Sequence, residues 1–407
     1  MKIIPGGVTA PKGFEAAGVE AGIKYENRKD MALIYSQRPC VAAGAFTSNK
    51  VKAAPVLRDM RIVEESPYVR AVVVNTGIAN AATGKDGLKC CDDTASEAAA
   101  LLGVPEDSVL IGSTGVIGPV LPMDRIKAGL KKLVSAKAAA KGSGFDAATA
   151  IMTTDTHPKE FAVELEIGGA TVTIGAISKG SGMIHPDMCT MLSFVTTDAA
   201  ISKEALTKLV KNDVKDTYNM ISVDGDTSTN DSFIVLANGA AANPVILPGT
   251  PEYEAFGKAI HAVNEHQAKA LAEDGEGATK LIECKVVNAA SKEDARLLAR
   301  SVISSNLTKA AVFGRDANWG RIICALGYSG AGFDPGKVCL YFDRDGEKFT
   351  LYEYGRGVDF DEDEAKKILS ASSVRIVADM NDGCESAVAW GCDLTYDYVK
   401  INGDYRS

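Results

Sequence analysis

An alternating apolar segment near the middle of the chain constrains the fold most. Phe161, Val163, Leu165 and Ile167 are spaced by two and share one face of a strand. Gly168 and Gly169 follow, and a second alternating segment runs over 170–177, so the pattern predicts a β-hairpin. A glycine-rich loop then leaves the hairpin and leads into the apolar segment 191–195, which predicts a buried strand that begins at Thr190.

Helical and extended patterns alternate along the rest of the chain. Ser202 precedes a segment of helical spacing, and Ser291 with Asp294 has the form of a capping box. We expect helices over 93–102 and 123–140, after Ser202 and Ser291, and up to about Leu369, and strands over 374–378 and 396–401. The chain has no repeat and no low-complexity linker, which predicts a mixed α/β (α+β) protein.

Composition excludes several classes of function. The net charge of −9 and the sequence pI near 5.2 disfavour a nucleic-acid partner, since such proteins usually carry a basic patch. No apolar run is long enough to span a membrane, and residues 1–6 lack the core of a signal peptide, so we expect a cytoplasmic protein. The nine cysteines form no Cys-x-x-Cys pair and there are four histidines, which predicts reduced thiols and no metal site.

Three polar loops resemble ligand-binding motifs only in part. The loop 180–185 lacks the third glycine of a dinucleotide fingerprint, and Gly84-Lys85 precedes Asp86 where a phosphate loop needs Ser or Thr. The acidic loop 224–231 lacks the glycine and glutamate positions of a calcium loop. We therefore predict a hydrogen-bonded Asx/Ser turn at 224–231 and no nucleotide site.

Thr190 has a second interpretation besides the start of a strand. A threonine at a chain N-terminus can act as a nucleophile, because its own α-amine, with a pKa near 8, serves as the base. Thr190 reaches that state only if the bond after Cys189 is cut, and the preceding glycines permit a strained backbone there. Spacing alone favours the simple strand start.

Acyl transfer also needs hydrogen-bond donors for the oxyanion that forms. The segment 111–118 contains Thr114 and Gly115 in a glycine-rich turn that can present such donors. A plain strand-to-helix connection explains this segment equally well.

Ten motifs, in this order, resemble the ornithine acetyltransferase (glutamate N-acetyltransferase) family from end to end. They lie at 7–14, 43–47, 75–84, 112–118, 152–155, 179–192, 224–231, 274–280, 314–320 and 402–407. The resemblance implies an N-terminal-nucleophile-like layered sandwich that cleaves itself into an α chain, residues 1–189, and a β chain, residues 190–407. It implies a cytoplasmic enzyme of arginine biosynthesis whose two α and two β chains form a heterotetramer.

The same resemblance implies the reaction and the residues that perform it. Thr190 takes the acetyl group of N-acetylornithine as an ester and releases ornithine, and glutamate then attacks the ester to give N-acetylglutamate. Thr114 and Gly115 fall where the family forms its oxyanion hole, and Cys189 precedes the cleaved bond in place of the usual alanine. The positions that contact substrate are Thr153, Lys179, Thr190, Glu276, Asn402 and Ser407.

The resemblance implies no bound cofactor and leaves open whether acetyl-CoA is a second acetyl donor. One alternative is a self-processing amidase or aminopeptidase in which water takes the acyl group. Another is an uncleaved binding protein that retains the fold without the chemistry. Release of free acetate without glutamate separates the first alternative from the transferase, and an intact chain mass would favour the second.

Overall fold

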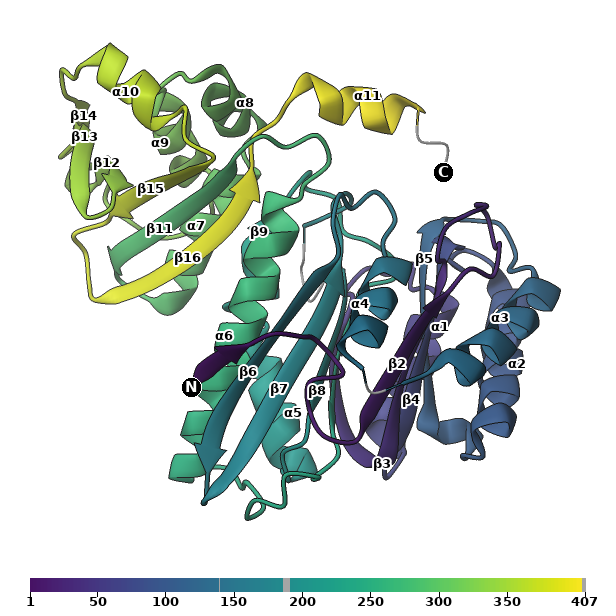
Figure 1. The fold of residues 1–407 in the computed structure, drawn as a ribbon. Coiled ribbons are helices and arrows are strands. Elements are labelled where there is room, and N and C mark those ends of the chain that lie inside the picture. Colours follow the sequence, from purple (N-terminus) through teal and green to yellow (C-terminus); the bar gives the residue numbers. More distant parts are fainter. Residues whose placement is uncertain (139, 186–190, 405–407) are drawn as a thin grey trace.

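Two β-sheets organise the structure, a computed structural model that describes residues 1–138, 140–185 and 191–404 (Figure 1). In the described residues the larger sheet has the order β1-β6-β7-β8-β10-β3-β4-β5, with β2 beside β3. Its strands are β1 (Lys2–Ile4), β2 (Phe14–Val19), β3 (Met31–Phe46), β4 (Val69–Ile78), β5 (Val109–Val116), β6 (Lys159–Ile167), β7 (Ala170–Lys179), β8 (Leu192–Thr197) and β10 (Ser232–Ala237).

The larger sheet folds over on itself at the long strand β3. Residues 31–35 of β3 pair with β2 and β4, residues 41–46 pair with β10, and the β3–β4 register shifts between Tyr35 and Cys40. Phe194 of β8 and Leu110 of β5 meet in one apolar core between the two halves. The two halves of the sheet therefore pack face to face.

Helices cover both outer faces of this sandwich. On one side α6 (Pro251–Glu273) packs on β6 and β7 and α5 (Lys203–Asp213) packs on β3, and the core beneath them includes Val163 and Phe233. On the other side α2 (Gly84–Leu102) and α3 (Met123–Ala136) cover the second half. The helices α1 (Ala54–Glu65) and α4 (Lys141–Ala150) contribute to the inner core. The order helix, sheet, sheet, helix confirms the expected layered α/β sandwich.

A smaller sheet forms the second part of the molecule, at the upper left of Figure 1. Its order among the described residues is β14-β13-β12-β15-β11-β16-β9. The strands are β9 (Ile221–Ser222), β11 (Leu281–Ala289), β12 (Cys339–Arg344), β13 (Glu347–Glu353), β14 (Arg356–Gly357), β15 (Ser373–Asp379) and β16 (Glu385–Cys392), and its helices are α7 (Lys292–Ser304), α8 (Asn306–Gly314), α9 (Trp319–Gly327) and α10 (Glu362–Ile368). Because β9 lies between α5 and β10 in the chain and α6 also contacts β16, one core joins the two parts.

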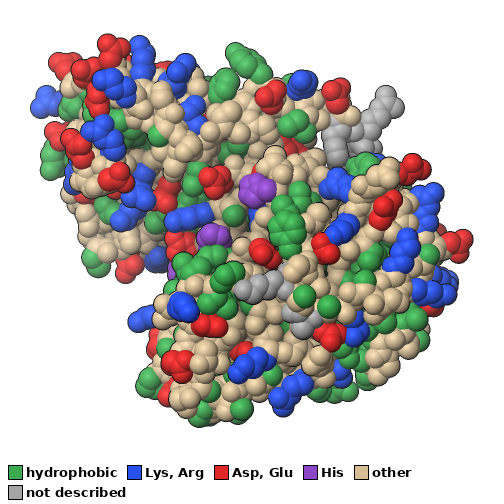
Figure 2. Space-filling view, in the orientation of Figure 1, with side chains coloured by type: hydrophobic (Ala, Val, Ile, Leu, Met, Phe, Trp, Pro, Cys, Tyr) green, Lys and Arg blue, Asp and Glu red, His purple; other side chains and the backbone are tan. Residues whose placement is uncertain are grey.

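Charged side chains of both signs alternate over the second part on the face in Figure 2. Arg344, for example, pairs with Glu347 and with Glu364 of α10. Exposed ion pairs of this kind contribute little to stability, because water and salt screen them. The apolar core therefore holds this part together more than its surface charges do.

Among the described residues, every helix is too short or too polar to cross a membrane.

Several predicted elements are confirmed. The hairpin is β6 and β7, paired from Lys159 with Ser178 to Ile167 with Ala170. The hydroxyl of Ser202 accepts a hydrogen bond from the N–H of Ala205, and that of Ser291 from the N–H of Asp294. The boundaries differ: α2 begins at Gly84, α3 ends at Ala136, and β8 begins at Leu192.

The predicted strand at 396–401 is wrong, because this segment is the helix α11 (Tyr396–Asp404). The Thr395 hydroxyl accepts a hydrogen bond from the N–H of Tyr398 and donates one to the carbonyl of Gly277. These bonds begin a helix at Thr395 and attach it to the loop after α6. Tyr396 and Val399 are exposed to solvent on this helix.

Candidate active site

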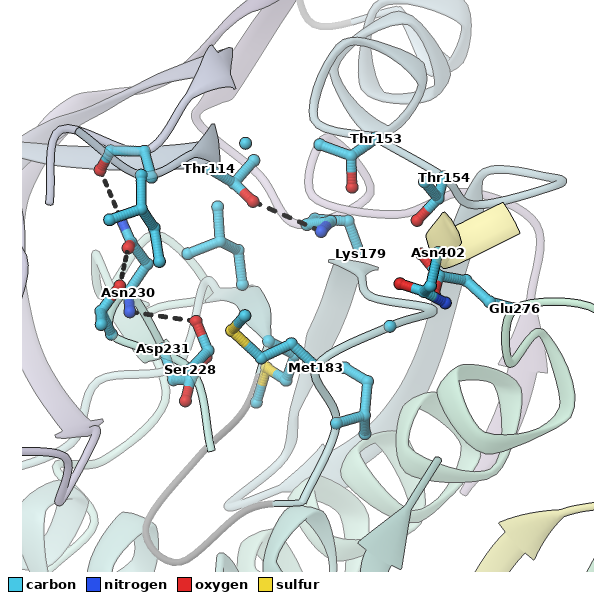
Figure 3. Close-up of a pocket in the computed structure, with 18 residues that line it drawn as sticks. Thr114, Thr153, Thr154, Lys179, Met183, Ser228, Asn230, Asp231, Glu276 and Asn402 are labelled. Carbon is cyan, nitrogen blue, oxygen red and sulfur yellow. Dashed lines mark hydrogen bonds between the residues drawn. The ribbon is translucent and has the colours of Figure 1, made fainter. Parts of the chain in front are cut away.

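A cavity of about 310 Å³ lies where strand ends from both halves of the sandwich meet (Figure 3). This is the lower end of the size range of small-ligand sites. Its wall includes the ends of β5 and β7, the start of β8, the turn before β10, and the helix α11. The lining residues that the argument uses are Thr114, Gly115, Thr153, Lys179, Met191, Ser228, Asn230, Asp231, Glu276 and Asn402.

Thr114 and Gly115 lie at the end of β5 in this wall. Gly115 has φ +128°, and a Cβ there would overlap the backbone of Gly77 on the neighbouring strand β4. Only glycine fits this position without displacing β4. The hydroxyl oxygen of Thr114 accepts a long hydrogen bond, 3.4 Å, from the Nζ of Lys179.

Lys179 brings a buried ammonium group to the cavity from the end of β7. Burial lowers the pKa of Lys179 from its usual value, and nearby Lys159 lowers it further. Asp155, Glu276 and Asp231 oppose that shift, in this order. The site thus holds one basic group among several carboxylates, which suits a ligand that carries both charges.

Asp155 organises the groups behind Lys179. Its carboxylate accepts hydrogen bonds from the N–H groups of Thr153 and Gly180, and from the Nζ of Lys159 at 2.8 Å. Burial alone would raise the pKa of Asp155, but Lys179 and Lys159 outweigh it and lower the pKa to about 2. Asp155 is therefore an ionised carboxylate that holds two backbone segments in place and stabilises the positive charges of two lysines.

The network continues to the end of α6. The Nζ of Lys159 also donates to the carboxylate of Asp274, which accepts hydrogen bonds from the N–H and hydroxyl of Thr156. Two residues after Asp274, Glu276 enters the cavity wall. One chain of buried charges thus connects the loop at Thr153 with the loop at Glu276.

Glu276 closes the side of the cavity beneath α11. Its N–H donates to the carbonyl of Ser181 at 2.8 Å, and its Oε2 accepts from the side-chain amide of Asn402 at 2.7 Å. A Cβ at Gly182 would overlap the Glu276 carboxylate, so this glycine makes room for the charge. The C-terminal helix is therefore tied to the site through Asn402.

The turn before β10 confirms the predicted Asx/Ser turn. The carboxylate of Asp224 accepts from the N–H groups of Asp226 and Ile184, and the hydroxyl of Ser228 accepts from the N–H of Asn230. The side-chain amide of Asn230 donates to the carbonyls of Ala79 and Ser113, at 2.6 and 2.8 Å. Asn230 thus fixes this turn against the segment that carries Thr114.

Six residues predicted as site residues meet in this one cavity, although the chain separates them by up to 288 positions. They are Thr114, Gly115, Thr153, Lys179, Glu276 and Asn402. The predicted nucleophile Thr190, its neighbour Cys189 and the terminal Ser407 lie outside the described residues. The catalytic and substrate-binding roles of all nine remain predictions.

Sequence reasoning gave no role in the site to Asp155, Lys159, Asn230 or Asp231. Asp155, Asn230 and Asp231 stand in motifs that carried the resemblance, which was the available signal. Lys159 had no signal, because its partner Asp274 is 115 residues away. Among the described residues no cluster of His, Cys, Asp or Glu is arranged to hold a metal ion.

The fold and the cavity together define a class of protein. A layered α/β sandwich with a small cavity lined by opposite charges and hydroxyl groups is typical of an enzyme that acts on an amino-acid-sized, zwitterionic molecule.

Comparisons with known proteins then give the family. The family model described as the ArgJ family matches residues 15–407. The arginine biosynthesis bifunctional protein ArgJ of Symbiobacterium thermophilum is 54% identical over 409 residues and covers both chains completely. The ArgJ protein of Thermotoga neapolitana is 52% identical over 401 residues, which is 98% of this chain and 99% of that one.

Among solved structures, the bifunctional protein ArgJ from Bacillus halodurans matches with a TM-score of 0.50 and 43% identity. That match covers 52% of this chain and 98% of the solved chain. The chain belongs to the ArgJ family, as the motifs predicted, and it is an acyltransferase of arginine biosynthesis.

The lowered pKa of Asp155 predicts a pH dependence of stability. The group is ionised in the folded state down to pH of about 2, while its ordinary pKa is 3.8. Its contribution of roughly 2 kcal/mol to the free energy of unfolding is therefore complete above pH 4 and is lost as the pH falls toward 2. Asp155→Asn should lower the melting temperature at pH 6 and flatten its decline between pH 4 and 2.

Thermal unfolding at a series of pH values measures this effect. Asp146→Asn, which removes a more exposed ion pair with Lys29, is the matched control and should keep the wild-type decline. An Asp155→Asn curve parallel to that of the wild type would contradict the role of Asp155.

Proposed function

We propose that this chain is an ornithine acetyltransferase that cleaves itself between Cys189 and Thr190 and transfers acetyl by a ping-pong mechanism. The observation that carries the proposal is the single cavity that gathers Thr114, Gly115 and Lys179 beside Met191. Residue 190 is bonded covalently to Met191, so a nucleophile at that position is attached to the cavity wall. The match to a solved ArgJ chain about half as long as this one supports a two-chain product.

In the first half-reaction, the hydroxyl oxygen of Thr190 attacks the acetyl carbon of N-acetylornithine, and the hydroxyl proton passes to the α-amine of Thr190. The Thr114 hydroxyl and the Gly115 N–H stabilise the oxyanion. The C–N bond then breaks, the amine returns the proton to the leaving nitrogen, and ornithine departs. The acetyl group remains as an ester on Thr190.

In the second half-reaction the amino group of glutamate attacks the ester carbon. The same oxyanion donors act again, and the attacking nitrogen gives a proton to the α-amine of Thr190. The C–O bond of the ester then breaks, and that proton passes to the Thr190 oxygen, which restores the hydroxyl as N-acetylglutamate leaves. Lys179 binds the α-carboxylate of either amino acid, and Glu276 binds the side-chain ammonium of ornithine. Thr153, Asn402 and Ser407 orient the substrate.

The proposal includes the assembly, the cellular location and a second acetyl donor. Two α chains, residues 1–189, and two β chains, residues 190–407, form a heterotetramer. The enzyme is cytoplasmic, which the free thiols of the described cysteines favour. Acetyl-CoA serves as a co-substrate that acetylates Thr190 directly, which the word bifunctional in the names of the relatives supports.

Intact mass under denaturing conditions tests the cleavage. The wild type should give two species that divide between Cys189 and Thr190, and Thr190→Ala should give one full-length, inactive chain. With the wild type, N-acetylornithine and glutamate should yield ornithine and N-acetylglutamate, and acetyl-CoA should replace N-acetylornithine. Cleavage of Thr190→Ala would refute the nucleophile, and free acetate released without glutamate would instead identify a hydrolase.

Replacement of Thr114 tests the oxyanion hole. Loss of one oxyanion donor typically reduces kcat about 10²-fold to 10³-fold. Thr114→Ala should show such a loss, while Thr114→Ser retains the hydroxyl and should stay within about tenfold of the wild type. Steady-state kinetics with N-acetylornithine measures both variants, and equal rates for Thr114→Ala and the wild type would remove Thr114 from the mechanism.

A further inference from the structure

Asn230 carries a buried side-chain amide in the cavity wall to which the acetyl-transfer steps give no role (Figure 3). The residue is 6% exposed. Its Nδ2 donates to the carbonyls of Ala79 and Ser113, at 2.6 and 2.8 Å, and its Oδ1 accepts from the Thr229 hydroxyl at 2.6 Å. Carbonyl oxygens only accept hydrogen bonds, so the nitrogen end of the amide must face them. Both amide hydrogens therefore hold main-chain groups.

The two carbonyls lie where the pairing of β4 and β5 becomes irregular. The strands stay in register up to the pair Gly77 and Gly115, and the register shifts at Ile78. Irregular pairing of this kind is common beside active sites, where it redirects the backbone. Ala79 follows the shift, and Asn230 links it to a carbonyl of β5. The amide thus joins the two segments at the point where their regular pairing ends.

This link holds the backbone that carries the two proposed oxyanion donors. The carbonyl of Ser113 and the N–H of Thr114 belong to one planar peptide unit, so a fixed carbonyl also fixes the backbone direction at Thr114. Gly115 has the conformational freedom of a glycine, so its N–H keeps one direction only if the residues beside it are held. Donors for an oxyanion must be aimed before the reaction, because turning them during it would add to the barrier.

We propose that Asn230 is a positioning residue for the oxyanion hole. Its amide holds the carbonyls of Ala79 and Ser113, and thereby aims the Thr114 hydroxyl and the Gly115 N–H at the oxygen that becomes negatively charged. Asn230 moves no proton, and its contribution is the alignment of the donors. This inference rests on the proposed function, in which Thr114 and Gly115 are those donors.

The variant Asn230→Ala tests the alignment. It removes both donated hydrogen bonds and leaves room for water beside the two carbonyls, so the chain should still fold. Because the donors lose their direction and not their chemistry, kcat with N-acetylornithine should fall about 10-fold to 10²-fold, less than for the loss of a donor. An interaction made only in the transition state leaves substrate binding unchanged, so KM should stay within about threefold.

Asn243→Ala is the matched control. Asn243 is 5% exposed, and its Nδ2 also donates to two main-chain carbonyls, those of Ala200 at 3.1 Å and Pro244 at 2.7 Å. It lies in the loop after β10 and is not among the described residues that line the cavity. Both variants should lower the melting temperature, whereas only Asn230→Ala should lower kcat.

A double-mutant cycle tests whether Asn230 acts through the donors. Once Thr114→Ala has removed one donor, misalignment has less left to affect. Asn230→Ala should therefore reduce kcat by a smaller factor in the Thr114→Ala background than in the wild type. Asn243→Ala should leave kcat unchanged in both backgrounds.

Rates refer to the cleaved protein, the amount of which is given by intact mass. Asn230→Asp keeps the shape of the side chain but offers the carbonyls no N–H group, and it should show the same selective loss if Asn230→Ala is too unstable to assay. An unchanged kcat, a loss of kcat shared with Asn243→Ala, a loss mainly in KM, or multiplicative losses in the cycle would each overturn the role. Full-rate turnover by Thr114→Ala would refute the proposed oxyanion hole instead.

Discussion

The buried ammonium of Lys179 is the interaction on which the site depends. An isolated charge at this depth would be strongly unfavourable, so the surrounding structure must supply counter-charges. Asp155 does so while it also holds the N–H groups of Thr153 and Gly180, and Lys159 links it to Asp274. The same contacts of Asp155 thus balance the lysine charges and hold the lining segments in place. Moving either lining segment would leave a buried charge without its partner.

The folded sheet explains how residues from distant strands reach this network. In a flat sheet, β5 would lie far from β7, because β8, β10, β3 and β4 separate them. The shift of register in β3 lets one half of the sheet cover the other, and Phe194 then packs on Gly112 across the core. The absence of a side chain at Gly112 permits this approach, and it brings Thr114 within hydrogen-bonding distance of Lys179.

Local patterns predicted the elements whose causes are local. The period-two spacing before Gly168 gave the hairpin, and the hydroxyls of Ser202 and Ser291 gave two helix starts. The segment at Tyr396 failed because its helix depends on a bond from Thr395 to Gly277, which lies 118 residues earlier in the chain. For the same reason the sequence identified Lys179 and Glu276 only through resemblance. It did not reveal Lys159, which matters because its ammonium group bridges the carboxylates of Asp155 and Asp274.

The two proposed half-reactions would place opposite demands on one end of the cavity. Both amino acids carry an α-carboxylate, so the fixed ammonium of Lys179 suits either. Their side chains end in opposite charges, so Glu276, in its proposed role, would attract the ammonium of ornithine and repel the carboxylate of glutamate. Asn402 donates to the Glu276 carboxylate at 2.7 Å, and so partly offsets its charge. Asn402 belongs to α11, so the group that moderates Glu276 sits on a helix that buries none of its own residues. Under this proposal, the preference for ornithine over glutamate at this end of the cavity depends on the hydrogen bond between Asn402 and Glu276.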